Sequence, residues 1–153
     1  MNRAPTLAVI GAAQASPALS TLAYEVGAEI ARQGAVLICG GRGGVMEAAA
    51  HGARDQGGHT IGILPGYERA AANPYIEFPI ATGIGEARNV IVVASADAVI
   101  ALQGAAGTLA EIGFALKLGR PLVALASWPE LEISERAETP MAAVARALVM
   151  AGR

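Results

Sequence analysis

Two glycine-rich segments, each set between a short apolar run and a helical pattern, constrain the fold of this chain more than any other feature. The segment Gly40–Glu47 follows the apolar run Ala35–Cys39, and the segment Gly104–Glu111 follows Ala98–Leu102. Glycine lets the backbone approach a ligand closely, and a helix start offers unpaired N–H groups and the positive end of a dipole. These turns therefore predict phosphate binding at two strand-to-helix junctions.

Strand-like and helix-like segments alternate along the chain with short connections, which is typical of a parallel sheet with right-handed crossovers. The pattern predicts one Rossmann-like α/β domain over residues 1–153, a doubly wound parallel sheet with helices on both faces. Ligands of such sheets bind at the carboxyl ends of the strands. Further strands are predicted at Leu7–Ile10, Thr60–Leu64 and Pro121–Leu125, and helices from Pro17 to about Gly34, from the first glycine turn to about Asp55, over Thr108–Leu118, and from Pro140 onward.

Four segments have weaker signals. Residues Tyr67–Pro74 predict a surface loop, and Tyr75–Ile80 predicts a short edge strand because its proline cannot donate a ladder hydrogen bond. Periodicity does not decide between strand and helix for Gly83–Asp97. Trp128–Glu138 predicts an acidic loop before the last helix.

Composition excludes several classes of protein. The chain is 54% hydrophobic and 16% charged, enough to bury a core and unlike a disordered chain. No apolar run approaches the roughly 20 residues of a membrane span, and the first residues lack a signal-peptide pattern, so we expect a cytoplasmic protein without membrane contact. A net charge of −2 gives no electrostatic footprint for nucleic acid.

The residue types favour neither metal nor thiol chemistry. His51 and His59 lack a second ligand at metal spacing, so no metal site is expected. Cys39 is the single cysteine and ends a predicted strand, which favours a buried structural thiol over a nucleophile. The glycine turns also lack a Walker A lysine, and Met46 stands where a dinucleotide fingerprint needs its third glycine. An ordinary ATPase or NAD dehydrogenase is therefore disfavoured.

Three motifs in order, Gly40–Ala48, Gly85–Asn89 and Gly104–Glu111, resemble a Rossmann-like superfamily. This superfamily contains the Lonely Guy phosphoribohydrolases, often called lysine-decarboxylase-like proteins, and the molybdenum cofactor carrier proteins. The similarity runs from about residue 6 to residue 125, and Glu138–Val144 is similar to the short bacterial carrier-like branch. The resemblance implies a nucleotide-type ligand, with molybdenum cofactor or a nucleoside monophosphate as the bound molecule.

In the hydrolase branch the resemblance implies catalytic roles for Glu111 and Arg88, which would cleave the N-glycosidic bond of a nucleoside 5′-monophosphate. Carboxylate and arginine suit that reaction, because positive charge develops on the ribose while the phosphate is held in place. This chain departs from the hydrolase motif, since Gln103 replaces its proline and Ala105 its second glycine. We therefore expect a carrier or binding protein first, a phosphoribohydrolase second, and a sensor of a nucleotide signal third.

The expected ligand contacts come from the end of the first strand, from both glycine turns and from the segment between the turns. Arg88 lies near a helix start, where the dipole disfavours a cation, which favours contact with a ligand or an interface. Thr108 and Glu111 also fit a helix capping box, and the structural and functional interpretations both stay open. The expected ligand-binding residues are Gly11, Gly41, Arg42, Gly43, Gly44, Val45, Met46, Arg88, Asn89, Gly104, Gly107 and Thr108.

The alanine-rich composition leaves apolar helix faces to cover, so we expect a homo-oligomer, either a dimer or a tetramer. The expected partner is a phosphorylated small molecule, and no cofactor is expected to be needed for folding.

Overall fold

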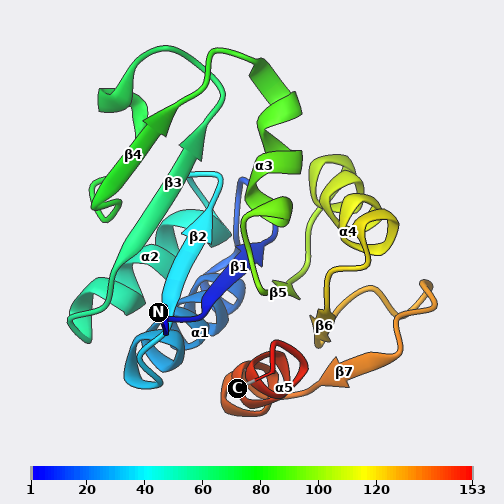
Figure 1. The fold of residues 1–153 in the computed structure, drawn as a ribbon. Helices are drawn as coiled ribbons and strands as arrows, with labels where there is room; N and C mark the ends of the chain where they lie inside the picture. Colours follow the sequence, from blue (N-terminus) through cyan, green and yellow to red (C-terminus); the bar gives the residue numbers. More distant parts are fainter. Residues whose placement is uncertain (1, 153) are drawn as a thin grey trace.

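The computed structural model describes residues 2–152 and shows a parallel sheet between two layers of helices (Figure 1). Seven strands pair in the order β4-β3-β2-β1-β5-β6-β7, and every pair of neighbours is parallel. The strands are β1 (Thr6–Ile10), β2 (Val36–Cys39), β3 (Thr60–Leu64), β4 (Phe78–Ala81), β5 (Ala98–Ala101), β6 (Leu122–Leu125) and β7 (Glu135–Ala137).

The helices divide between the two faces of the sheet. Alternate strand residues face opposite sides, so Leu7 and Val9 join one core cluster while Ala8 and Ile10 join the other. On the first face lie α1 (Pro17–Arg32), α2 (Val45–Asp55) and α5 (Pro140–Met150); on the second lie α3 (Arg88–Ala94) and α4 (Ala106–Leu118). The predicted Rossmann-like α/β fold is confirmed. Among residues 2–152, no helix combines the length and the apolar composition that crossing a membrane requires.

Local signals placed the starts of two helices correctly. The Ser16 hydroxyl accepts a hydrogen bond from the Leu19 N–H at 3.2 Å, and the Thr139 hydroxyl accepts one from Ala142 at the same distance. Proline follows each cap at the first helical position, where its missing N–H costs nothing. These two helices begin where the sequence predicted.

Two weak segments acquire a definite structure. Gly83–Asp97 contains a short 3-10 turn followed by α3, and Val92 and Val93 of this helix are buried against the sheet. The loop predicted over Trp128–Glu138 was wrong in part, because Glu135–Ala137 pair in parallel with β6 as the edge strand β7. A three-residue strand with two charged side chains carries no period-2 apolar pattern, which is why the sequence did not reveal it.

The order of the strands creates a crevice at one end of the sheet. From β1 the chain adds β2, β3 and β4 on one side, then crosses back to place β5 on the other side of β1. Loops leave the carboxyl ends of β1 and β5 toward opposite faces, which is the usual position of a ligand site. Helix α5 starts beyond the carboxyl end of β7 and returns, so Met150 lies near Pro121 and Leu122 at the start of β6. It is therefore at the same amino-terminal edge as Thr6, which begins β1.

Candidate functional site

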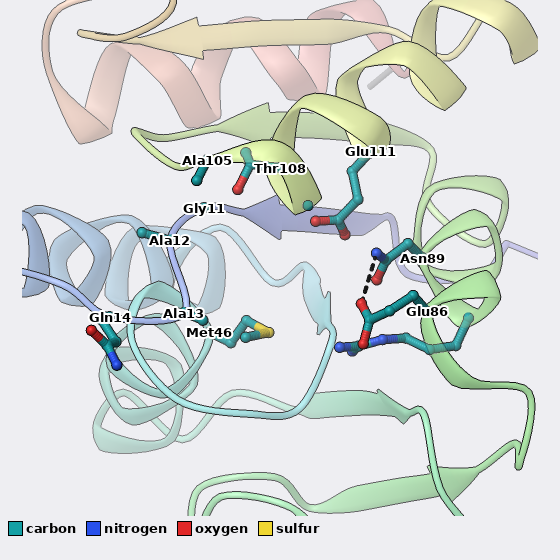
Figure 2. A pocket seen from close by; sticks show the side chains of 12 residues that line it. Gly11, Ala12, Ala13, Gln14, Met46, Glu86, Asn89, Ala105, Thr108 and Glu111 are labelled. Carbon is teal, nitrogen blue, oxygen red and sulfur yellow. Dashed lines mark hydrogen bonds between the residues drawn. The ribbon is translucent and has the colours of Figure 1, made fainter.

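A cavity of about 330 Å³ opens at the carboxyl ends of β1 and β5 (Figure 2). Its walls come from the loop after β1 and from the starts of α2, α3 and α4. Such a volume lies at the lower end of the range for small-molecule sites. Of the residues predicted from the sequence, those that line it are Gly11, Met46, Arg88, Asn89, Gly107, Thr108 and Glu111.

The cavity also has walls that sequence analysis missed. Ala12–Gln14 in the loop after β1, Ala105 and Glu86 line it without having been expected to contact a ligand. The strand order could have indicated Ala12–Gln14, because the loop after the central strand of such a sheet borders the crevice. Glu86 lay within the motif that carried the family resemblance, although no role was assigned to it.

The start of α4 forms one end of the cavity. The helix begins at Ala106, and no side chain caps its first N–H groups. A Cβ at Gly107 would meet no other atom within 4 Å, so the space beside this turn is open. Unpaired N–H groups and the positive end of the helix dipole meet at this point, an arrangement that binds anions.

Of the two interpretations left open for Thr108 and Glu111, the structure does not show the capping box, since the N-cap of α4 is Ala105. Because α4 begins two residues before Thr108, this threonine lies in the first turn, and its hydroxyl packs closely against Gly104. A side chain at Gly104 would collide with the Thr108 hydroxyl, so close packing accounts for the glycine at this position. Glu111 is thus free of the capping role that the sequence allowed.

Glu111 is an isolated buried carboxyl that points into the cavity (Figure 2). Its residue is 9% exposed, and no described residue donates a hydrogen bond to it. Burial raises the pKa of Glu111 to about 7; the Arg88 guanidinium opposes this rise and the Glu86 carboxylate adds to it. A group with such a pKa exchanges a proton readily near neutral pH.

Arg88 reaches main-chain carbonyls from the start of α3. Its Nη1 donates to the carbonyl oxygen of Ile63 at 2.9 Å and also to that of Gly40, so it joins the ends of β2 and β3. The residue is 6% exposed and lines the cavity, and its Nε has no hydrogen-bond partner. Arg88 therefore has a structural role that the sequence did not indicate, and a ligand contact stays a prediction.

The glycines of the first turn allow close packing against other segments of the protein and do not border the cavity. Gly41 has a φ of 76° and lies against Gly62 and Leu64, while Gly44 has a φ of 65° and lies against the loop after β1. Arg42 is exposed to solvent. Only Met46 of the expected residues in this turn borders the cavity; the expected residues that do not are Gly41, Arg42, Gly43, Gly44, Val45 and, from the second turn, Gly104.

The structure does not favour Cys39 as a nucleophile. Cys39 is buried, as predicted, and burial raises the pKa of its thiol to about 12. The thiolate needed for nucleophilic attack is therefore scarce at neutral pH. In the described part of the chain, no three His, Cys, Asp or Glu side chains gather in a way that could hold a metal ion.

Comparison with known proteins identifies the family of this chain. The family model LDcluster4, described as the SLOG cluster4 family, matches residues 4–150. The chain belongs to the SLOG cluster4 family. This confirms the superfamily that the three motifs indicated.

Solved structures similar to this SLOG cluster4 protein include two with a stated ligand class. The molybdenum cofactor binding protein of Rippkaea orientalis superposes with a TM-score of 0.86 at 37% identity, covering 94% of each chain. The molybdenum cofactor carrier protein of Chlamydomonas reinhardtii superposes with a TM-score of 0.90 at 34% identity, covering 99% of this chain and 100% of the other.

A further relative is an enzyme. The cytokinin riboside 5′-monophosphate phosphoribohydrolase of Mycobacterium tuberculosis is 36% identical over 134 residues, which are 80% of this chain and 71% of the relative.

Proposed function

We propose that this SLOG cluster4 protein binds a phosphorylated small molecule in the cavity and acts as a carrier, with molybdenum cofactor as its cargo. The uncapped start of α4 beside the open space at Gly107 carries this proposal, because it offers an anion site inside a ligand-sized cavity. Similarity to the two molybdenum cofactor proteins supports the choice of cargo.

The substitution Gly107→Leu is expected to abolish cargo binding without unfolding the protein. A leucine here would occupy the open end of the cavity, and replacing a helical glycine favours folding. Native mass spectrometry after incubation with molybdenum cofactor measures retention of the ligand. Gly66→Leu is the matched control, because Gly66 also has no atom within 4 Å of a Cβ and lies outside the cavity. Equal retention by both variants, or none by the wild type, would refute the proposal.

A second candidate is a nucleoside 5′-monophosphate phosphoribohydrolase. Glu111 favours it, since its carboxyl lines the cavity and has a pKa of about 7, as a proton-transfer group requires. Chromatography of AMP and GMP incubated with the protein tests this activity directly. Base release by the wild type that disappears in Glu111→Gln would replace the carrier with the hydrolase.

We also propose that the protein is a homo-oligomer whose copies meet on the face formed by α3 and α4. Leu109 and Leu116 of α4 are 46% and 56% exposed, and Glu111 of this largely apolar helix turns inward. Burying such side chains against a second copy removes apolar area from water. Leu116→Glu is expected to give monomers in light scattering after gel filtration, whereas Val149→Glu, at an exposed position of α5, leaves the wild-type mass. A monomeric wild type, or dissociation by Val149→Glu alone, contradicts this interface.

A further inference from the structure

The two ends of the cavity differ in polarity. The start of α4 presents N–H groups and the positive end of a dipole, which suits an anion. Toward α3 the cavity is bordered by the side chains of Glu86, Asn89 and Glu111 (Figure 2). A ligand that fills the cavity thus meets main-chain donors at one end. At the other end it meets oxygen acceptors beside the Arg88 guanidinium, whose Nε has no partner.

The acceptors at the α3 end lack donors within the protein. Glu111 is 9% exposed and Asn89 is 6% exposed, yet no described residue donates a hydrogen bond to either side chain. The Asn89 amide reaches Glu86 Oε2 only at 3.4 Å. Both side chains line the cavity, so a ligand that brings hydrogen-bond donors can pair with these oxygen atoms.

Arg88 does not neutralise this end of the cavity by direct pairing. Its Nη1 is taken by the carbonyl oxygens of Gly40 and Ile63, and no salt bridge joins it to Glu86 or Glu111 among the described residues. The Glu86 carboxylate is exposed at the rim and keeps Oε1 without a protein donor. It is therefore available to accept two parallel hydrogen bonds from a planar ligand edge.

We propose that Glu86 selects the heterocycle of the ligand by accepting hydrogen bonds from a ring N–H and an adjacent amino group, with Asn89 beside it and the phosphate at the start of α4. This edge, a 2-amino-4-oxo pyrimidine ring, is shared by pterins and guanine. A carboxylate matches two adjacent N–H donors in the bidentate manner known from charged hydrogen bonds. The inference rests on the proposed function and extends it by assigning the orientation and the chemical class of the ligand.

The ring edges of other purines fit this end less well. Adenine presents one amino donor beside a ring-nitrogen acceptor, and that acceptor would face a carboxylate. Hypoxanthine keeps the ring N–H but lacks the 2-amino group, so it offers one donor in place of two. GMP and IMP therefore form a matched pair of probes that share phosphate, ribose and ring system and differ in the amino group alone.

The test compares GMP with IMP by isothermal titration of the full chain. We expect the wild type to bind GMP about ten- to a hundredfold more tightly than IMP, the effect of one additional hydrogen bond to a charged group. Glu86→Gln is expected to remove most of this preference and to weaken IMP less than GMP, because the single amide oxygen of glutamine can still accept from the ring N–H that both ligands share. Glu25→Gln, an exposed glutamate on α1, is the matched control and keeps the preference.

Competition by inorganic phosphate distinguishes the proposed phosphate site at the start of α4 from the proposed role of Glu86 in selecting the heterocycle. If GMP and IMP bind equally and phosphate displaces both, the proposed phosphate site stands and the assignment of Glu86 is refuted. A preference for GMP that persists in Glu86→Gln also refutes that assignment. If none of the three probes binds, the proposed orientation is refuted, and retention of molybdenum cofactor in native mass spectrometry then decides the proposed function separately.

Discussion

Replacing Glu111 with glutamine is expected to stabilise the protein at pH 8 and to change its stability little near pH 4. Burial raises the pKa of Glu111 to about 7 in the folded state, against 4.5 for an unperturbed glutamate. Between these two pH values the unfolded chain has lost the proton while the folded protein still holds it. The free energy of unfolding therefore falls as pH rises through this range, and above pH 7 the full destabilising effect of Glu111 is present. The cost of the buried charge is then roughly 3 kcal/mol, and a neutral amide of the same size avoids it.

Urea denaturation of wild type and Glu111→Gln at several pH values between 4 and 8 measures this difference. Glu25→Gln serves as the control, because Glu25 is exposed on α1 and its replacement should have a small effect. A destabilisation of Glu111→Gln that is equal at every pH would contradict the prediction. That outcome would instead indicate a hydrogen-bonding role such as the cap that the sequence suggested.

Removal of the Arg88 side chain is the second change with a large expected effect. In Arg88→Ala the buried carbonyl groups of Gly40 and Ile63 lose a charged donor, and the variant leaves an empty volume beneath α3. Hydrogen bonds to charged groups contribute about 1.5–3 kcal/mol each, and breaking a buried charged network costs about 3–5 kcal/mol. We therefore expect Arg88→Ala to lower the free energy of unfolding by roughly 3 kcal/mol or more.

Chemical denaturation checks this expectation against Arg120→Ala. Arg120 also donates to a carbonyl oxygen, that of Ala94, at 2.7 Å, but it lies at an exposed position where water replaces the lost bond. Arg120→Ala should therefore cost little. If Arg88→Ala were equally mild but lost ligand affinity, Arg88 would act mainly on the ligand, as the family resemblance implied, and the structural role would be refuted.

The fold was predictable because its signals are local and redundant. Apolar runs such as Ala98–Leu102, proline after Ser16 and Thr139, and glycine at helix ends all indicate the same α/β alternation. Strand β7 was not predicted, because its formation depends on pairing with β6 rather than on a pattern in its own residues. Helix α3 was undecided for a related reason, since its valines suit a strand until packing buries them as a helix.

The candidate site was predictable at the level of segments and less so for individual residues. The second glycine turn and the Gly85–Asn89 motif do border the cavity, because parallel strands bring their carboxyl ends to one edge. The first turn mostly does not, since glycine serves close packing between main chains as readily as it serves a ligand. Sequence alone cannot separate these uses, nor can it reveal that Arg88 bonds to carbonyl oxygens of β2 and β3.

The all-parallel sheet has a practical consequence for anyone who attaches this protein to something else. Every strand points toward the cavity edge and α5 runs back from it, so Thr6 and Met150 both lie on the far side of the molecule. A tag, a fluorescent label or a sensor surface joined at either end would leave the mouth of the cavity facing solution. Binding measured on such an immobilised sample would thus report the same site as binding measured free in solution.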